Sequence, residues 1–530
     1  MCSLEIGGVI ARQISVLLVL GFGAGVCCGE SSASQPGRHF AIEVIDEQTG
    51  RGVPMVELQT TSAVRYYTDS GGLIAFYEPG LMDRRVFFAV SAHGYEFPKD
   101  GFGIRGIVLE TKAGGSAQLK VKRLNIAERL YRITGQGIYR DTVLLGRKAP
   151  IAEPLLNAEV TGQDGILTAI YRGKLYWFYG DTGRLAYALG SFAMSGATTE
   201  LPDKIDPSVG FNLKYFVGKD GFARAMAPIG GEGVVWLFGV GVLPDESGRE
   251  RMLAYFQRRR GLGAVLENGF VVYNDGKDAF EKLNNVPLDP PLYPTGYLFR
   301  VKQDGVEYVY FTTPYPALRV RADWKSYPDL SAYEGYTCLK PGTRYGSKDD
   351  VQLDRDDGGK LVWGWKRDTP PLNPKDQNDL VAAGKMKREE SPFRLQDAEG
   401  GKPILLNNCS CFWNDYRKKY TMIASEAMGA TMLGEVWYSE ADRPEGPWVH
   451  ARKIITHANK QGDAHDFYNP TQHPWFDREG GRVIYIEGSY VNTFSGNPHP
   501  TPYYEYNQIM YRLDLSDPRL KLPAEATAER

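Results

Sequence analysis

The sequence predicts an all-β protein, on the basis of its composition and of the spacing of its apolar segments. Aromatic residues make up 12% of the 530 residues and Gly contributes 60, a combination typical of short strands joined by tight turns. Apolar residues at 42% and charged residues at 24% exclude a wholly disordered chain. The length predicts about two to four domains. Because 62 Lys and Arg are balanced by 64 Asp and Glu, the chain lacks the basic excess of a nucleic-acid-binding protein.

The first thirty residues are expected to be a signal peptide rather than part of the fold. Arg12 precedes an uncharged run with an apolar block at residues 16–20 and glycines after it. A membrane-spanning helix needs about 20 predominantly apolar residues, and this run is interrupted by Gly. The alternative is a short buried helix. We therefore expect a signal peptide over 1–30, a linker over 31–38, and a secreted or periplasmic protein without a later transmembrane segment.

The six cysteines do not form the framework of a disulfide-rich domain. Cys27 and Cys28 are candidates for a lipid anchor, although the residues before them match a lipobox poorly. Cys409 and Cys411 are two apart on an expected strand, so their side chains point to the same face. We expect them to be buried small hydrophobic residues rather than metal ligands, and a bridge to Cys338 stays open.

Residues 39–125 are expected to form a β-sandwich. Apolar segments of strand length recur there about every ten residues, which is typical of a sandwich of under about 100 residues. The segments are Phe40–Ile45, Val53–Thr60, Leu73–Tyr77 and Val86–Ser91.

The order of these segments resembles an immunoglobulin/transthyretin-like sandwich of the carboxypeptidase regulatory-like family. The matching features are Thr68-Asp69-Ser70-Gly71-Gly72 before a strand, and the later Ala92-His93-Gly94-Tyr95. The resemblance implies an accessory domain and assigns no catalytic residue to it.

Residues 126–530 contain a loose repeat of five hairpins with Gly or Asp at their tips. Radially repeated hairpins of this kind predict a five-bladed β-propeller, and an array of β-sandwiches is the alternative. The returning strands are Gly173–Gly180, Gly231–Gly239, Asp304–Phe311, Asp415–Ile423 and Gly480–Gly488. Further outward we expect strands at Glu250–Arg258, Leu318–Ala322, Glu435–Ser439 and Gln508–Leu515, with Tyr131–Leu145 closing the ring. The segment 327–402 is rich in charge and turns, and we expect it to be a large inserted loop over one face.

The register of the first hairpin brings two carboxylates together. Its tip lies between Arg172 and Gly173, so Asp164 is expected opposite Asp181, at the end of the hairpin furthest from the tip. In a propeller this end lies at the mouth of the central channel. An aligned start predicts that Asp220 reaches the same mouth from the second blade.

The fourth and fifth hairpins add further acids. Glu487 ends the returning strand of the fifth hairpin where Asp181 ends that of the first, and Glu426 does so in the fourth. Carboxylates that converge on one concave face can hydrolyse glycosidic bonds, with one as proton donor and another as nucleophile or base. We therefore predict Asp164, Asp181, Asp220 and Glu487 as catalytic residues. Taken singly, each is also compatible with a role in a turn or cap.

Five of the seven histidines lie between residues 450 and 499. His465, Asp466 and His473 open the fifth blade, where they could hold a calcium ion in the channel or act as bases. No His-x-x-x-His spacing appears, so we assign no metal ligand and no certain cofactor. Arg224, His473 and Tyr490 are expected to bind substrate. Tyrosines of the loop 503–506 could stack on sugar rings.

Two short motifs resemble the opening of secreted five-bladed propeller glycosidases. They are Gln163-Asp164-Gly165 and the segment from Leu175 to Thr182, which ends in Tyr-Gly-Asp-Thr. The closest resemblance is to a bacterial family, formerly of unknown function, that includes endo-acting D-arabinanases. It implies catalysis by Asp164 and Asp181. Related arabinanase, xylosidase and fructosidase propellers have a third-blade glutamate, and Pro294–Tyr297 offers none, so the proton donor is left unassigned.

We therefore expect a monomeric, secreted glycoside hydrolase acting on an arabinan-like extracellular polysaccharide. The alternatives are a non-catalytic propeller that binds glycan or protein, and a polysaccharide lyase that uses His473 and a tyrosine. The sequence contains no nucleotide-binding loop, dinucleotide fingerprint or serine-hydrolase elbow, which disfavours those chemistries.

Overall fold

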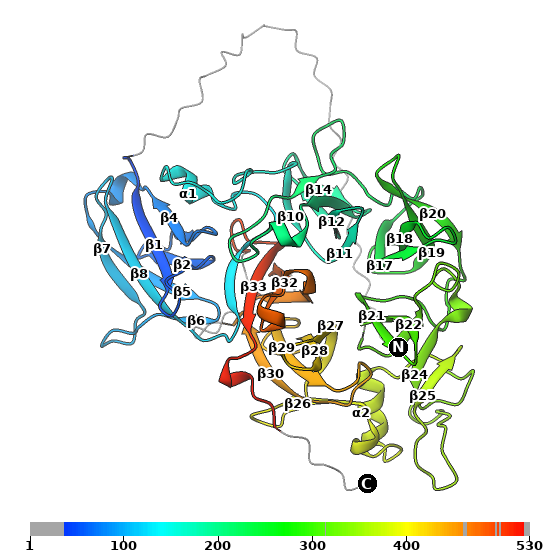
Figure 1. Ribbon diagram of the computed structural model, residues 1–530. Coiled ribbons are helices and arrows are strands. Elements are labelled where there is room, and N and C mark those ends of the chain that lie inside the picture. Colours follow the sequence, from blue (N-terminus) through cyan, green and yellow to red (C-terminus); the bar gives the residue numbers. More distant parts are fainter. Residues whose placement is uncertain (1–36, 313, 459–463, 493–494, 498–499, 524–530) are drawn as a thin grey trace, which may run out of the picture. The chain divides into compact units, whose positions relative to one another are not determined.

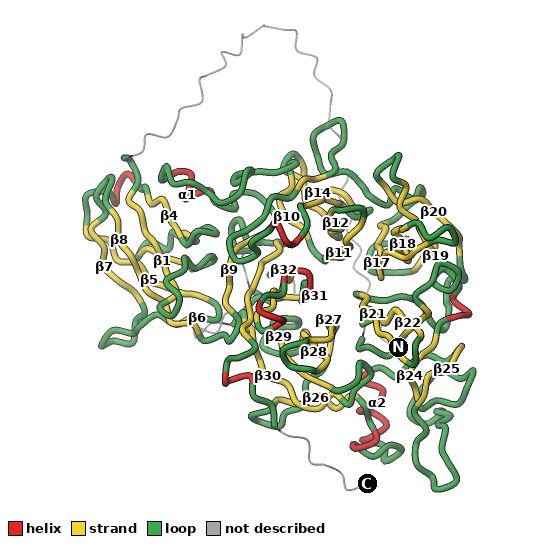
Figure 2. Tube along the Cα trace, in the orientation of Figure 1, coloured by secondary structure: helices red, strands yellow, loops and turns green. Residues whose placement is uncertain are grey.

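The computed structural model describes residues 37–312, 314–458, 464–492, 495–497 and 500–523. The all-β expectation is confirmed: the described residues form 33 strands and two α-helices, α1 (Arg140–Leu144) and α2 (Pro374–Ala382) (Figures 1 and 2). No helix within these ranges has the length and apolar character needed to cross a bilayer. The expected signal peptide, with Cys27 and Cys28, lies outside the described residues.

Two four-stranded sheets form the N-terminal part of the described chain. They share one apolar core, in which Ile42 and Val44 of one sheet and Leu58, Phe88 and Val90 of the other are almost completely buried. The alternation of buried and partly exposed residues along these strands explains why each sheet has one face on this core. The strand orders are β4 (Leu73–Phe76), β1 (Phe40–Asp46), β8 (Ser116–Arg123), β6 (Tyr95–Glu96), and β3 (Arg65–Tyr67), β2 (Val56–Thr60), β5 (Arg85–Ala92), β7 (Gly106–Glu110).

Five sheets of four or five strands, here numbered one to five, follow in chain order, together with a small sheet of β10 (Val160–Gln163), β13 (Thr182–Arg184) and β14 (Tyr187–Ser191). The innermost strands of sheets one and two, two and three, and four and five contact each other. Sheet one is β11 (Ile166–Tyr171), β12 (Lys174–Tyr179), β15 (Ser195–Thr199), β16 (Lys214–Tyr215), and sheet two is β17 (Val234–Pro244), β18 (Glu250–Arg259), β19 (Val265–Asn274), β20 (Ala279–Asn285). Sheet three is β21 (Leu298–Gln303), β22 (Val306–Phe311), β23 (Leu318–Arg321), β24 (Glu334–Thr337), β25 (Gly364–Arg367). Sheet four is β26 (Phe393–Asp397), β30 (Trp448–Thr456), β29 (Glu435–Ala441), β28 (Lys419–Glu426), β27 (Leu406–Asn414).

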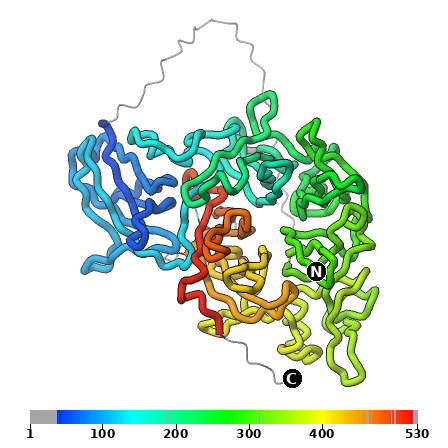
Figure 3. The backbone as a smooth tube through the Cα atoms, in the orientation of Figure 1, coloured from blue at the N-terminus to red at the C-terminus, as the bar shows by residue number. Residues whose placement is uncertain are grey.

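Sheet five is completed by a strand from far earlier in the chain. Its order is β31 (Asp466–Gln472), β32 (Val483–Val491), β33 (Asn507–Asp514), β9 (Glu128–Arg132). Figure 3 shows the cyan segment of β9 beside the red segment of β33. The expected closing strand Tyr131–Leu145 is therefore only partly right. Its second half forms α1, because Asp141 and Thr142 hydrogen-bond to the N-terminal sheets instead of continuing a ladder.

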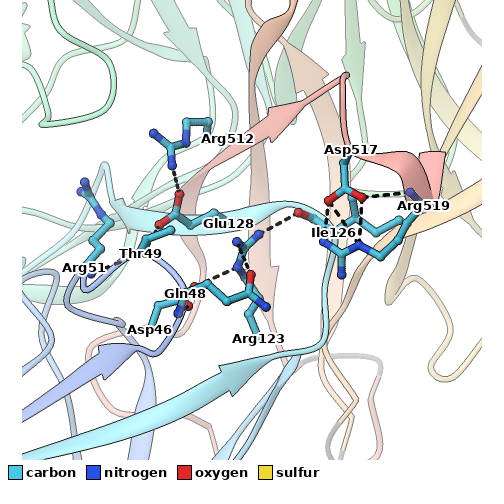
Figure 4. Close-up of polar contacts among 10 residues, drawn as sticks. All are labelled: Asp46, Gln48, Thr49, Arg51, Arg123, Ile126, Glu128, Arg512, Asp517 and Arg519. Atoms are coloured by element: carbon cyan, nitrogen blue, oxygen red, sulfur yellow. Dashed lines mark hydrogen bonds and ion pairs between the residues drawn. The ribbon is translucent and has the colours of Figure 1, made fainter.

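Glu128 of β9 joins the N-terminal sheets to sheet five (Figure 4). Its carboxylate accepts hydrogen bonds from Thr49 Oγ1 at 2.7 Å and from Arg512 Nη2 at 2.5 Å. Arg123 donates to Asp46 Oδ2 and to the Ile126 carbonyl, each at 2.8 Å, and so fixes the segment between β8 and β9.

The second hairpin differs from the prediction. Gly231–Gly239 was expected to be a returning strand, but its residues open the innermost strand β17, and Glu250–Arg258 lies in the second strand rather than the outer one. The segment expected before it forms no ladder with β17. Instead, the Ala223 and Met226 N–H groups bond to Ala158 and Met194.

The segment 327–402 is structured rather than an irregular loop. It adds β24 and β25 to sheet three, forms α2, and lays β26 parallel to β30 in sheet four. It has its own apolar cluster, which includes Cys338, Leu361 and Leu380. As predicted, Cys409 and Cys411 are buried small residues. These two cysteines and Cys338 are free thiols, so the bridge left open is not formed.

Candidate active site

Asp164 and Asp181 lie together at one end of the first hairpin. Ile166 pairs with Tyr179, so the predicted register is correct. The Asp164 N–H donates to the Asp181 carbonyl at 3.3 Å, and the Asp181 N–H donates to Asp164 Oδ1 at 3.0 Å. Gly180 is needed between them, because a Cβ there would lie 2.3 Å from Asp164 Oδ1.

Asp164 is surrounded by hydrogen-bond donors. Tyr468 Oη donates to Asp164 Oδ2 at 2.9 Å, and the Tyr506 hydroxyl also bonds to this carboxylate. Burial, followed by the nearby charge of Asp181, raises the pKa of Asp164 to about 6, while the two tyrosine hydrogen bonds work in the opposite direction. Asp164 therefore changes charge close to neutral pH.

Asp181 borders a cavity of about 680 Å³. Trp236 of sheet two donates its Nε1–H to Asp181 Oδ1 at 3.2 Å. Burial raises the pKa of Asp181, and the Trp236 hydrogen bond partly offsets this. Aromatic side chains of Phe192, Tyr503 and Tyr506 also line the cavity, which gives it flat apolar surface beside an acid.

Glu505 is the second acid that lines this cavity, beside Asp181, and it was not among the residues predicted from the sequence. Its carboxylate accepts the Asn492 N–H at 3.1 and 3.2 Å to its two oxygens. Burial raises the pKa of Glu505 to about 7; the Asn492 N–H opposes this rise, and the charge of Asp466 adds to it. The only signal in the sequence was the aromatic loop 503–506, from which tyrosines rather than Glu505 were chosen.

Glu487 and His473 form a fully buried pair that does not line this cavity. Both side chains are fully buried, with His473 Nε2 2.8 Å from Glu487 Oε2. Glu487 was expected to take the place of Asp181 at a strand end. β32 continues to Val491, however, so Glu487 lies inside the strand, opposite Thr471. His473, which was predicted to bind substrate, does not line this cavity either.

The remaining predicted residues do not line the cavity beside Asp181. Asp220 lies on a turn, with 53% of its side chain exposed, and pairs with Arg184 at 2.9 Å. Arg224 Nη2 donates to the carbonyls of Lys277 and Asp278 and so fixes a turn of sheet two. Tyr490 is fully buried. The reason is the same for Asp220 and Arg224: the segment before β17 runs beside sheet one instead of starting a blade.

The calcium site considered for the channel has no ligand set in the described part of the chain. Within those ranges, no group of three or more His, Cys, Asp or Glu side chains is arranged to hold a metal ion. His465 and Asp466 are buried, and Glu426 is bonded to Trp437 Nε1 at 2.8 Å.

Comparisons with known proteins give structural neighbours only. No protein-family profile matches the chain, and no curated protein matches it in sequence. Among solved structures, a thermostable family-43 glycoside hydrolase matches with 14% identity and a TM-score of 0.32, over 70% of this chain and 95% of that one. An exo-β-1,3-galactanase from Phanerochaete chrysosporium matches with 10% identity and a TM-score of 0.35, over 74% and 66%.

A third neighbour is an exo-1,5-α-L-arabinanase from a bovine ruminal metagenomic library. It has 11% identity and a TM-score of 0.32, over 67% of this chain and 93% of that one. Because all three TM-scores are below 0.5, these likenesses carry no weight for function, which must be inferred from the residues around the cavity.

Proposed function

We propose that the protein is a secreted glycoside hydrolase that cleaves an arabinan-like polysaccharide in the cavity beside Asp181. One observation carries this proposal: Asp181 and Glu505 border the same cavity, and Asp164 is hydrogen-bonded to the backbone of Asp181. Three neighbouring acids with raised pKa values are characteristic of sites for general acid–base chemistry. The order and closure of sheets one to five support a five-bladed propeller as the scaffold, and the shared core of the N-terminal sheets supports a transthyretin-type sandwich before it.

Glu505 is the best-placed proton donor. With a pKa of about 7, a large fraction of this carboxyl is protonated at neutral pH, as a general acid requires. Its proton would pass to the glycosidic oxygen as the bond from that oxygen to the anomeric carbon breaks. If Asp181 attacks the anomeric carbon, a water molecule later supplies the hydroxyl of the new reducing end and its proton restores Glu505. If Asp181 instead deprotonates a water that attacks in the same step, the proton that Asp181 gains is released to solvent and Glu505 takes one up from solvent.

Asp181 is the best-placed nucleophile or base. It lies on the cavity, and the Trp236 N–H stabilises its charged form. It would either attack the anomeric carbon or deprotonate the attacking water. Asp164 holds the Asp181 N–H, and its own negative charge would stabilise the positive charge that develops on the sugar ring.

The direct test is a screen of the purified protein for release of reducing sugar from arabinans and other plant and bacterial polysaccharides. Asp164→Asn and Asp181→Asn change charge but hardly change volume, so each should fold and lose about 100-fold or more in activity. Full activity in both variants would remove these residues from the mechanism. Retention of a glycan without cleavage would indicate a binding module, and new unsaturated uronate absorbance would indicate a lyase.

A further inference from the structure

The loop that carries Glu505 and Tyr506 is attached to the N-terminal sheets through the residue before them. Tyr504 is buried, with 2% of its surface exposed. Its hydroxyl accepts the Met55 N–H at 3.0 Å and donates to the Thr68 carbonyl at 2.5 Å. One side chain of the loop is thus fixed by two backbone groups of the N-terminal sheets.

The backbone that holds Tyr504 is itself fixed. Asp69 Oδ2 accepts hydrogen bonds from the Thr142 N–H at 2.6 Å and from Thr142 Oγ1 at 2.8 Å. Ser70 Oγ accepts the Arg132 N–H at 3.1 Å, and the Arg132 guanidinium lies 4.9 Å from the centre of the Tyr504 ring. The Thr68–Ser70 turn therefore forms a rigid anchor next to β9.

The loop needs such an anchor because its backbone is strained. Tyr503 and Tyr506 have φ values of 65° and 59°, in the left-handed region that bulky residues rarely adopt. Such conformations persist only where the surroundings impose them, and they are frequent at functional sites. Inside the loop, the Tyr504 and Glu505 N–H groups both donate to the Thr501 carbonyl at 3.0 Å.

The other side of the loop meets the acid pair. The Gln163 N–H, one residue before Asp164, donates to the Tyr506 carbonyl at 2.6 Å. Gly162 permits this approach, since a Cβ there would lie 2.6 Å from the same carbonyl. Glu505 lies between Tyr504, which is bonded to the N-terminal sheets, and Tyr506, which is bonded to Gln163. These two contacts together fix the position of Glu505 on the cavity.

We propose that Tyr504 is a positioning residue through which Met55 and Thr68 of the N-terminal sheets fix Glu505 and Tyr506 beside Asp164 and Asp181. This inference rests on the proposed function. It makes the N-terminal sheets part of the catalytic apparatus, whereas the resemblance found in the sequence had implied an accessory domain without a catalytic role.

The test is Tyr504→Phe in the full chain, which removes the hydroxyl and keeps the ring. We expect kcat to fall about tenfold while KM changes by less than about twofold, as for loss of an interaction that serves the transition state. Glu505 should become better solvated, so the high-pH limb of the pH–rate profile should move to lower pH. Amide hydrogen exchange at residues 504 and 505 should become faster, because their bonds to Thr501 depend on the loop's conformation.

The matched control is Tyr333→Phe. Tyr333 is also fully buried and donates its hydroxyl to a backbone carbonyl, that of Tyr327, at 2.7 Å. It lies at the start of the 327–402 segment, so its loss should leave kcat, the pH profile and exchange in the loop unchanged.

The two proposals fail in different ways. If Tyr504→Phe matches the wild type in kcat, pH profile and loop exchange, the positioning role is wrong even though Asp181→Asn is inactive. If Asp164→Asn and Asp181→Asn both keep full activity, the proposed catalytic site is wrong. Amide exchange still decides whether Tyr504 holds the loop in that case, because it needs no substrate.

Discussion

Acids lie at the end of the first hairpin of sheet one and in the middle of sheet five, and of these Asp181 lines the cavity described above whereas Glu487 does not. Asp181 lines a cavity, and Asp164, which accepts the Asp181 N–H, feels its like charge, whereas Glu487 is fully buried against His473. Burial raises the pKa of the acid in both places. The comparison shows that burial alone does not identify a catalytic acid. An adjoining cavity, and a like charge in place of a partner, distinguish the proposed catalytic pair of Asp164 and Asp181 from the buried pair of Glu487 and His473.

The largest loss of activity outside the pair of Asp164 and Asp181 is expected for a substitution of Glu505, which lines the same cavity as Asp181. Glu505→Gln keeps the shape of the side chain and removes its proton, so activity should fall by about 100-fold, within the usual contribution of a general acid. In the wild type, activity should decline as the pH rises through about 7, because Glu505 then loses its proton. That limb should be missing from the pH–rate profile of the variant. An unchanged limb would assign it to another group.

Stability should respond with opposite signs in the two acid groups. Glu487→Ala leaves His473 buried without its partner and should lower the free energy of unfolding by about 3 kcal/mol.

The raised pKa of Asp164 means that the carboxyl binds its proton more tightly in the folded protein than in the unfolded chain. Its stabilising contribution is therefore full below about pH 4 and is lost as the pH rises through about 6. Asp164→Asn should consequently raise stability at pH 8 by about 1–2 kcal/mol and change it little at pH 4.

Urea denaturation of the wild type and both variants at pH 4 and pH 8 measures these free energies directly. Activity per folded molecule should survive in Glu487→Ala and fall about 100-fold or more in Asp164→Asn. A destabilised Asp164→Asn at pH 8 would contradict the burial argument for Asp164.

The smallest effect is expected at Asp220. Its side chain is half exposed and pairs with Arg184 in solvent, where such ion pairs contribute little. Asp220→Asn should leave both the melting temperature and the rate of hydrolysis within experimental error. A loss of activity comparable to that of Asp181→Asn would show that Asp220 takes part in the reaction although it does not line the cavity.

The sequence pattern correctly predicted the features that depend on pairing between strands adjacent in the chain. The turn at Arg172 and Gly173 fixes the register of one hairpin, and this alone brings Asp164 to Asp181. Asp220 was misplaced because the alignment assumed a strand where the chain forms a turn. Glu505 could not be found this way, since its position depends on contacts between Tyr504 and residues more than 400 positions earlier. Such contacts leave no periodicity in the sequence.

The late closure of sheet five also bears on how a newly made chain reaches its folded form. In sheet five, β33 lies between β32 and β9 and pairs with both. Both of these strands therefore have an unpaired edge until residues 507–514 have been synthesised. Unpaired edges are templates for association with other chains, and a nascent chain that stalls before β33 should therefore be prone to aggregate. The loop that carries Tyr504 and Glu505 directly precedes β33. Completion of sheet five, attachment of this loop to the N-terminal sheets and assembly of the proposed active site would thus occur as one late event in biogenesis.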